Sequence, residues 1–137
     1  MPEHIFFSII VPAHNEESYI ERTLTRLQQL NYPAARFETL VIENGSSDRT
    51  FELAKRFESP NMHVLQSGKG VSRAKNAGID HLAPQSDWVV FLDADTVLEK
   101  EFLNELDVFL RLRSIRQPLC RRQRPLRRFR ALGAAKG

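Results

Sequence analysis

Residues 5–12 read IFFSIIVP, and this stretch decides the fold class. The run from Ile5 to Val11 is almost continuously apolar and rich in β-branched side chains. Such a run is typical of a strand buried on both faces, and we expect Pro12 to end it. Strands buried in this way belong to sheets that helices cover on both sides. The stretch therefore predicts an α/β fold.

Further along the chain, apolar runs alternate with stretches of helical periodicity. Four alternations of strand and helix predict a mostly parallel sheet with helices on both faces. Asn15 is a plausible N-cap of the first helix, and Ser46 or Ser47 can cap the second. The expected strands are 5–11, 37–42, 62–65 and 88–92, and the expected helices start near residues 16, 48, 71 and 99.

Length and composition limit the classes of protein to consider. A chain of 137 residues with 42% hydrophobic residues is one ordinary globular domain. Cys120 is its single cysteine, so an intrachain disulfide is excluded and a reducing compartment fits. The start lacks the features of a signal peptide, and no apolar run is long enough to span a membrane. We expect a cytoplasmic location, with the inner face of the membrane as a variant of it.

The net charge of +3 is distributed unevenly along the chain. Residues 1–110 hold ten basic and seventeen acidic residues, whereas residues 111–137 hold ten basic residues and no acid. The acidic body argues against nucleic acid as the main partner. We therefore expect a globular part at 1–110 and a disordered basic tail at 111–137. The tail is either an arm that contacts anionic membrane or nucleic acid, or the product of a frameshift.

The residues that follow each strand are the candidates for function, because parallel α/β sheets bind ligands beyond the carboxyl ends of their strands. In Asp93-Ala94-Asp95 the two carboxylates are two positions apart and point the same way in an extended segment. Small Ala94 leaves room for a ligand. Carboxylate oxygens suit Mg²⁺ or Mn²⁺, often completed by substrate phosphates. The alternative is a pair of solvated turn acids.

The other loops carry weaker signals. Lys69, Gly70 and Arg73 lie in a glycine-containing loop before a helix, where a phosphate could bind or where the loop is only a flexible connection. Neither a full dinucleotide-binding fingerprint nor a phosphate-binding loop motif is present. Glu43-Asn44 could bond a base or ribose, or serve turn chemistry alone. His14 could stack on a base or bond it, or be structural or solvated. Glu16 could be a ligand, or only a favourable acid in the first turn of a helix.

Together these four loops resemble the family 2 glycosyltransferases, which have the GT-A fold of nucleotide-diphospho-sugar transferases. The resemblance covers about residues 5–110 and rests on four segments in the family's order. It implies an inverting transfer of sugar from a UDP- or GDP-linked donor to an acceptor hydroxyl, with a divalent metal. The matching segments are SIIVPAHNE at 8–16, VIENGSSDRT at 41–50, GVSRAKNAG at 70–78 and WVVFLDAD at 88–95.

The resemblance also implies roles for individual residues. Asp95 would hold the metal on the diphosphate, and Asp93 would face the ribose beside Ala94. Glu43 and Asn44 would contact the base, although many members have Asp-Asp or Asp-Asn there. The nucleoside pocket would be lined by Pro12, Ala13, His14 and Glu16, and the region near base or diphosphate by Lys69, Gly70 and Arg73.

The chain departs from the family pattern after Asp95. The general base of the family lies well downstream, so the catalytic residue is unknown and the fold is expected to be incomplete on its C-terminal side. The remaining acids, which we expect on the solvent side of the last helix, are Glu99, Glu101, Glu105 and Asp107. The sequence thus predicts a donor-binding half, truncated before an acceptor half. The alternatives are a non-catalytic remnant or binding module with a basic tail, and a nucleotidyltransferase, whose glycine-rich signature is missing.

Overall fold

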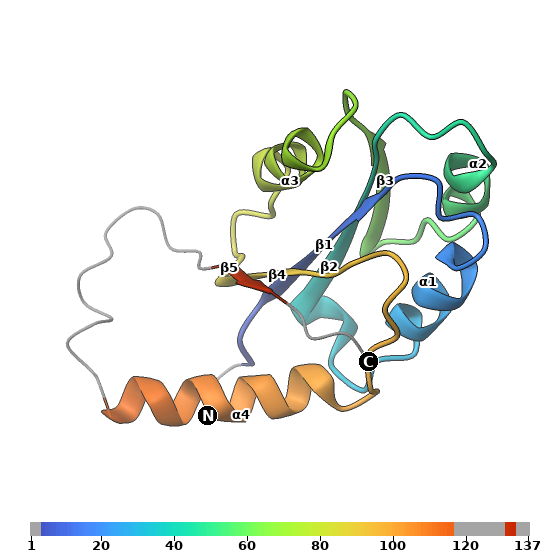
Figure 1. Cartoon of the computed structure of the whole chain (residues 1–137). Helices are drawn as coiled ribbons and strands as arrows, with labels where there is room; N and C mark the ends of the chain where they lie inside the picture. Colours follow the sequence, from blue (N-terminus) through green and yellow to red (C-terminus); the bar gives the residue numbers. More distant parts are fainter. Residues whose placement is uncertain (1–3, 117–130, 134–137) are drawn as a thin grey trace.

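The structure is a computed structural model and describes residues 4–116 and 131–133 (Figure 1). These residues contain a five-stranded sheet of order β3-β2-β1-β4-β5 in which neighbouring strands are parallel. The elements are β1 (Phe7–Ala13), α1 (Ile20–Gln28), the short 3₁₀ helix η1 (Ala34–Arg36), β2 (Phe37–Glu43), α2 (Thr50–Lys55), β3 (Met62–Gln66), α3 (Val71–Asp80), β4 (Trp88–Phe91), α4 (Phe102–Arg116) and β5 (Ala131–Gly133).

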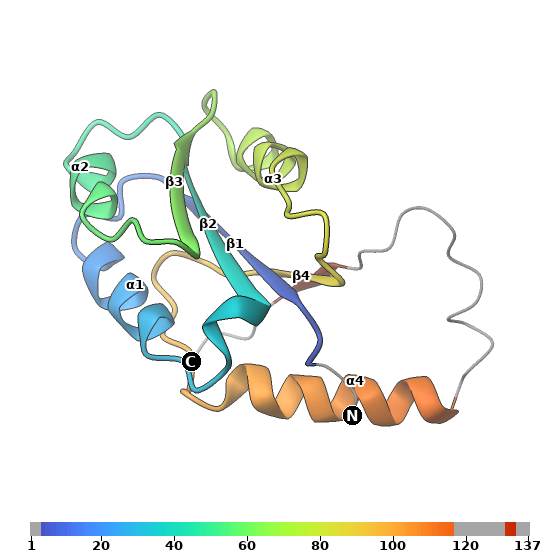
Figure 2. The same ribbon diagram turned by 180° about the vertical axis from the view of Figure 1, so that it is seen from behind.

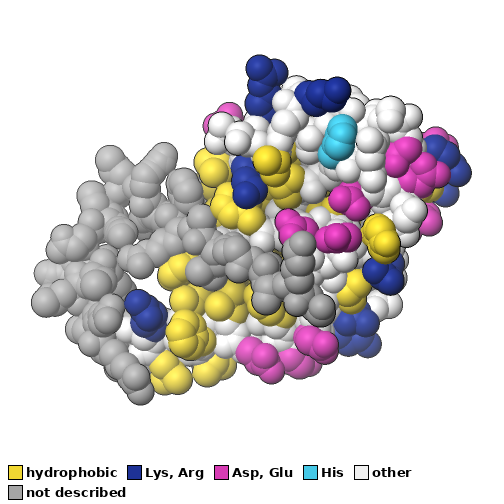
Figure 3. Space-filling model, in the orientation of Figure 1, with side chains coloured by type: hydrophobic (Ala, Val, Ile, Leu, Met, Phe, Trp, Pro, Cys, Tyr) yellow, Lys and Arg dark blue, Asp and Glu magenta, His cyan; other side chains and the backbone are white. Residues whose placement is uncertain are grey.

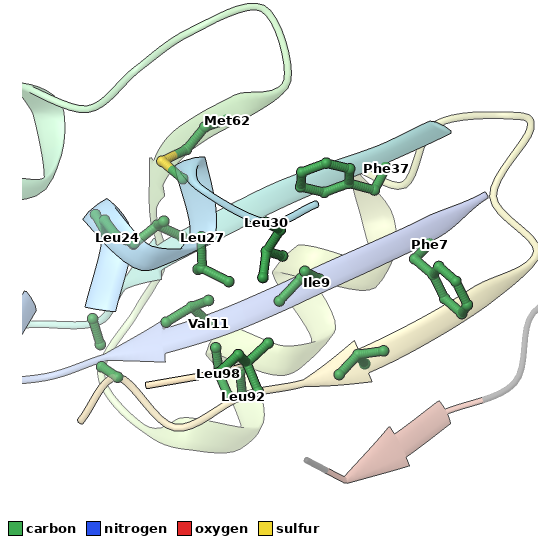
Figure 4. Close-up of a cluster of buried hydrophobic side chains, with 14 of the residues drawn as sticks. Phe7, Ile9, Val11, Leu24, Leu27, Leu30, Phe37, Met62, Leu92 and Leu98 are labelled. Carbon is green, nitrogen blue, oxygen red and sulfur yellow. The ribbon is translucent and has the colours of Figure 1, made fainter. Parts of the chain in front are cut away.

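Helices cover both faces of the sheet, as the sequence predicts. Figures 1 and 2 show α3 on one side of the strands and α1 with α2 on the other. Successive side chains of β1 point to opposite faces of the sheet. Ile9 and Val11 pack into the larger core with α1, and Ile10 packs into the smaller core beneath α3. Figure 4 shows the larger core, where Leu24 of α1 lies near β1. The α/β class with a parallel sheet is confirmed.

The prediction that Pro12 ends the first strand is wrong, because β1 continues to Ala13. The amide of Leu92 bonds the carbonyl of Ile10 on the β4 side, and the amide of Asn44 bonds the carbonyl of Ala13 on the β2 side. Successive residues face alternate sides, so the nitrogen of Pro12 faces β4. That strand has ended by then, at Phe91. No ladder donor is needed there, and proline is tolerated.

The predicted helix caps are also wrong. The helix α1 begins at Ile20 rather than near residue 16, and Asn15 has a positive φ of 52° instead of capping it. The helix α2 follows Arg49 and has no side-chain cap bond, so neither Ser46 nor Ser47 caps it. Asn15 and the two serines bond one another instead, since the loops after β1 and β2 are packed side by side.

The segment after the fourth strand differs from expectation in two respects. Glu99, Glu101 and Glu105 are exposed as predicted, but Asp107 is buried at 6% exposure and accepts the amide of Ile5 while pairing with Arg111. The expected domain boundary at residue 110 falls inside α4, which continues to Arg116. Residues 131–133 pair with β4, and the rest of the predicted basic tail lies outside the described residues.

One further absence concerns membranes. Among residues 4–116 and 131–133, no helix is both long enough and apolar enough to span a bilayer.

Candidate functional site

The site lies at the carboxyl edge of the sheet, where the loops after β1, β2, β3 and β4 come together. The strands β1 and β2 are paired over seven residues and end level with each other, Ala13 opposite Glu43. The strand β3 ends at Gln66, which pairs with Glu43. Because the strands are parallel, the three loops leave the sheet at the same edge. The predicted site residues therefore lie on adjoining loops.

The loop after β1 is anchored to the loop after β2 on both sides of Asn15. The ring nitrogen Nδ1 of His14 lies 2.8 Å from the backbone oxygen of Asn44. The amide of Glu16 donates to Oγ1 of Thr50 at 2.8 Å. His14 is exposed and Glu16 is half-buried, so both side chains remain at the surface of the site. Thr50 was not among the predicted site residues, because a buried threonine at a helix start carries no distinctive sequence signal.

Glu43 is buried, with 3% of its surface exposed. Its carboxylate accepts the backbone amide of Ser46 and the side-chain amide of Gln66, the latter at 3.1 Å. Burial alone would raise the pKa of Glu43, but these hydrogen bonds outweigh it and hold the pKa below its ordinary value. The ionised carboxylate thus joins the ends of β2 and β3, which is the turn chemistry considered as the alternative to base contact.

Asn44 joins three loops through one buried amide. Its Nδ2 donates to the carbonyl of Ala13 at 3.1 Å, and its Oδ1 accepts the amide of Gly70 at 3.4 Å. Only 4% of Asn44 is exposed. The side chain is therefore engaged with β1 on one side and with the start of α3 on the other. Like Glu43, it builds the floor of the site.

The loop before α3 brings basic side chains to this edge. Gly70 has φ of 115°, a conformation that favours glycine, and space is open where a Cβ would stand. Lys69 lies over Gly45, where an added Cβ would be 3.2 Å from the lysine Cγ. Arg73 folds back toward Gly68. Lys69 and Arg73 are both exposed, so two positive charges border the loop that follows β3.

The loop after β4 places two carboxylates outward and holds the residue between them inward. Asp93 and Asp95 are exposed, whereas Ala94 is buried at 2% exposure. The carbonyl of Ala94 accepts the hydroxyl of Thr23 at 2.6 Å, which ties this loop to α1. Both carboxylates lie on the solvent side, but the segment is a turn rather than extended, because the amide of Thr96 donates to the carbonyl of Asp93 at 3.0 Å.

Negative charge accumulates at this edge. Burial and the neighbouring carboxylates of Asp95, Asp93 and Asp48 raise the pKa of Glu16 above its ordinary value, and His14 offsets only part of this. Figure 3 shows acidic side chains, in magenta, gathered around the loop that follows β4. Asp48 was missed by the sequence analysis, although it follows the same strand as Glu43. Asp48 raises the pKa of Glu16 because the loops after β1 and β2 pack together.

The donor set suits a hard cation shared with a ligand rather than a site made by the protein alone. Within the described part of the chain, no group of three or more His, Cys, Asp or Glu side chains is arranged to hold a metal. One or two exposed carboxylates with excess negative charge are what a Mg²⁺ or Mn²⁺ site needs when phosphate oxygens supply the remaining ligands.

Comparison with known proteins agrees with this geometry. The model of the family described as glycosyl transferase family 2 matches residues 8–107. The chain belongs to glycosyl transferase family 2. Its family match includes all four loops, from Pro12 to Asp95, and the first part of α4, as far as Asp107.

Two curated family members illustrate the likeness. A poly(ribitol-phosphate) β-N-acetylglucosaminyltransferase, TarS of Staphylococcus aureus, is 29% identical over 108 residues, which are 76% of this chain and 18% of that protein. Glycosyltransferase AglE of Haloferax volcanii is 34% identical over 104 residues, which are 72% of this chain and 33% of that protein. This family 2 chain thus spans between about a fifth and a third of those two relatives.

Solved structures share the fold. Residues 1–349 of S. aureus TarS, crystallised in complex with UDP-GlcNAc, superpose with a TM-score of 0.68 at 28% identity, covering 77% of this chain and 31% of that one. A mannosyltransferase from Pyrobaculum calidifontis, in complex with GDP-Man and Mn²⁺, gives a TM-score of 0.66 at 24% identity. The sheet with its helices is therefore the GT-A arrangement of family 2, present here in part.

Proposed function

We propose that this family 2 chain forms the donor-binding part of a glycosyltransferase. It binds a nucleoside-diphosphate sugar, UDP- or GDP-linked, together with Mg²⁺ or Mn²⁺. The whole protein then transfers the sugar to an acceptor hydroxyl with inversion. The observation that carries the proposal is the negatively charged group of Glu16, Asp93 and Asp95 at the same edge of the sheet as two exposed cations, Lys69 and Arg73. The UDP-GlcNAc complex of the related TarS supports a nucleotide sugar as the ligand.

The carboxylates at this edge fit a divalent cation. Burial and the nearby carboxylates of Asp95, Asp93 and Asp48 raise the pKa of Glu16, so negative charge gathers at this edge. In the proposal Asp95 holds the metal on the diphosphate, and Asp93 faces the ribose. When bound, the metal acts as a Lewis acid that stabilises the negative charge of the departing diphosphate. Lys69, just before α3, and Arg73, in its first turn, are both exposed and add positive charge for the phosphates.

The nucleoside would lie over the ends of β1 and β2. The exposed ring of His14 is the surface available for a base or ribose, while Pro12 and Ala13 form the strand end beneath it. Glu43 and Asn44 are buried and bonded within the loops, so we propose that they shape the base pocket from below. Any direct bond from them to the base would use a remaining lone pair of the carboxylate or amide oxygen.

Calorimetric titration of the chain with UDP and with GDP, with and without Mn²⁺, tests the proposal. We expect binding of one nucleotide that strengthens with Mn²⁺. The Asp95→Ala variant should lose the metal-dependent part of the affinity, about tenfold or more. Asp80→Ala removes an exposed carboxylate from α3 and is the matched control. If Asp95→Ala keeps its response to Mn²⁺, or if the folded chain binds neither nucleotide, the proposal is wrong.

For the acceptor side of the reaction, the described residues support no assignment of a catalytic group. We assign no general base, since Glu99, Glu101 and Glu105 are exposed beyond the site and Asp107 is engaged with Ile5. A cytoplasmic location, and contact of the basic tail with an anionic membrane, stay proposals made from the sequence. Metal-dependent nucleotide binding also separates this function from that of a non-catalytic module, which would bind through the tail alone.

A further inference from the structure

Asn15 stands out because it is the one non-glycine residue with positive φ among the described residues. Its φ of 52° lies in the left-handed region, which most side chains avoid because Cβ approaches the following carbonyl oxygen. Asparagine tolerates this region better than most residues other than glycine. The conformation therefore calls for an explanation at the level of the surrounding contacts.

The side chain and amide of Asn15 bond the loop that follows β2. Its backbone amide donates to Oγ of Ser46 at 2.9 Å, and its Oδ1 accepts the backbone amide of Ser47 at 2.9 Å. These bonds join positions 31 and 32 residues apart in the chain. Asn15 therefore fixes its left-handed turn against a second loop.

The residues on either side of Asn15 are the two proposed donor-site residues of this loop. His14 is held at the backbone oxygen of Asn44, and the amide of Glu16 is held at Thr50. Three consecutive residues thus contact three successive points of the segment 44–50. A residue in the right-handed or extended region at position 15 would turn the chain differently, so His14 and Glu16 could not keep both anchors.

We propose that Asn15 is a positioning residue of the donor site. Its left-handed backbone, fixed by Ser46 and Ser47, sets where the ring of His14 and the carboxylate of Glu16 stand at the carboxyl edge. This inference rests on the proposed function, because the two side chains it places are those assigned to the nucleotide.

The test compares Asn15→Ala with Asn15→Gly by calorimetric titration with UDP and GDP in the presence of Mn²⁺. Glycine adopts the left-handed region without steric cost, whereas alanine does not. We expect Asn15→Ala to weaken nucleotide affinity about tenfold and Asn15→Gly to remain within about threefold of the unaltered chain. Rescue by glycine is a result that mere loss of the side chain cannot produce.

The control is Asn61→Ala, with Tm measured for every variant. Asn61 donates through Nδ2 to the carbonyls of Ala34 and Phe37 at the opposite end of β2, so its loss affects stability away from the site. Equal binding by Asn15→Ala and the unaltered chain would overturn the positioning role alone. The positioning role would also be overturned if Asn15→Gly lost as much nucleotide affinity as Asn15→Ala. The same holds if Asn61→Ala lost as much nucleotide affinity as Asn15→Ala. Absence of nucleotide binding by the unaltered chain would overturn the proposed function as well.

Discussion

Glu43 is a charged side chain that the fold removes almost entirely from water. Its pKa is lowered because the hydrogen bonds from Ser46 and Gln66 outweigh the effect of burial. The folded state therefore favours the ionised form. The stabilisation is present above the ordinary pKa range of glutamate and is lost as the pH falls through the lowered value.

This sign leads to a prediction for Glu43→Gln. We expect the free energy of unfolding to fall by about 1–2 kcal/mol near neutral pH, because glutamine replaces two charged acceptor oxygens by one neutral acceptor and one NH₂ donor. The difference between variant and parent should shrink as the pH falls below the ordinary range of glutamate and through the lowered pKa of Glu43. Urea unfolding at several pH values measures this, with the exposed Glu105→Gln as control. A deficit that stays constant with pH would contradict it.

Single residues are where sequence reasoning was least complete. Asp93 and Asp95 are both exposed, but the extended segment from which their direction was predicted is a turn closed by the amide of Thr96 and the carbonyl of Asp93. The interactions of Asn15, Thr50 and Asp48 could not be predicted, since each depends on a partner about 30 residues away or on the packing of two loops. Local sequence specifies which side chains a loop carries, and tertiary packing decides what they contact.

At the scale of elements, α3 lies unusually close to β1 at Gly78. A Cβ built on Gly78 would be 2.7 Å from Cγ2 of Ile10 and 2.8 Å from its Cδ1. Real side chains do not approach so closely. The contact therefore requires glycine in a helix interior, although glycine costs about 1 kcal/mol of helix propensity relative to alanine.

We accordingly predict that Gly78→Ala is destabilising by about 1–3 kcal/mol despite the better helix propensity of alanine, because Ile10 is fully buried and cannot move aside. Gly68→Ala is the matched control, since its new methyl group would meet only the flexible end of Arg73. It should change stability by less than about 0.5 kcal/mol. Thermal and urea unfolding measure both variants. Equal effects of the two substitutions would show that close packing at Gly78 is not the cause.

The type of each helix and strand was predicted well, whereas its first and last residues were predicted less well. The strands at Phe37–Glu43 and Met62–Gln66 were expected to within one residue, because apolar β-branched runs mark buried strands. The start of α1 was misplaced by about four residues. Residues 16–19 look like the first turn of a helix in sequence, but the amides of Glu16 and Glu17 donate to Thr50 and Asp48 of the adjoining loop. The carbonyl of Glu16 accepts the amides of Tyr19 and Ile20, which closes a turn before the helix.

At the scale of the whole molecule, the sheet order places β1 and β2 at the centre and β3 beside a single neighbour among the described strands. All seven residues of β2 are buried, whereas β3 has exposed positions. Global unfolding is needed to open a strand that is covered on both faces and both edges, while an outer strand can open locally.

Native-state hydrogen exchange should therefore be slowest in β1 and β2. We expect their amides to exchange only through global unfolding, with a free energy of about 5–15 kcal/mol for a domain of this kind. The amides of β3 should exchange several-fold faster through local opening. Mass spectrometry of peptides covering the three strands checks the order. Protection of β3 equal to that of β1 would contradict it and point to cover on its outer edge.

The parallel sheet followed from the alternation of strands and helices, and with it the meeting of four loops at one edge. The strand order could not be predicted, because no local sequence pattern indicates that β4 pairs with β1 rather than with β3. The extension of α4 past residue 110 was missed as well. The change to a basic composition there suggested a boundary, whereas helix formation depends on packing of Leu103 and Leu110 into the core.

The amide of Asn44 also bears on the chemical ageing of the protein. Asn44 precedes Gly45. In a flexible Asn-Gly pair the following backbone nitrogen attacks the side-chain carbonyl carbon, the Cγ–Nδ2 bond breaks and ammonia leaves, and the resulting succinimide hydrolyses to aspartate or isoaspartate. Here Nδ2 is bonded to Ala13 and Oδ1 to Gly70. While the chain is folded, the side-chain carbonyl therefore cannot turn toward the nitrogen of Gly45. Deamidation at Asn44 would accumulate only during unfolding, and the mass gain would record how long a sample had spent unfolded.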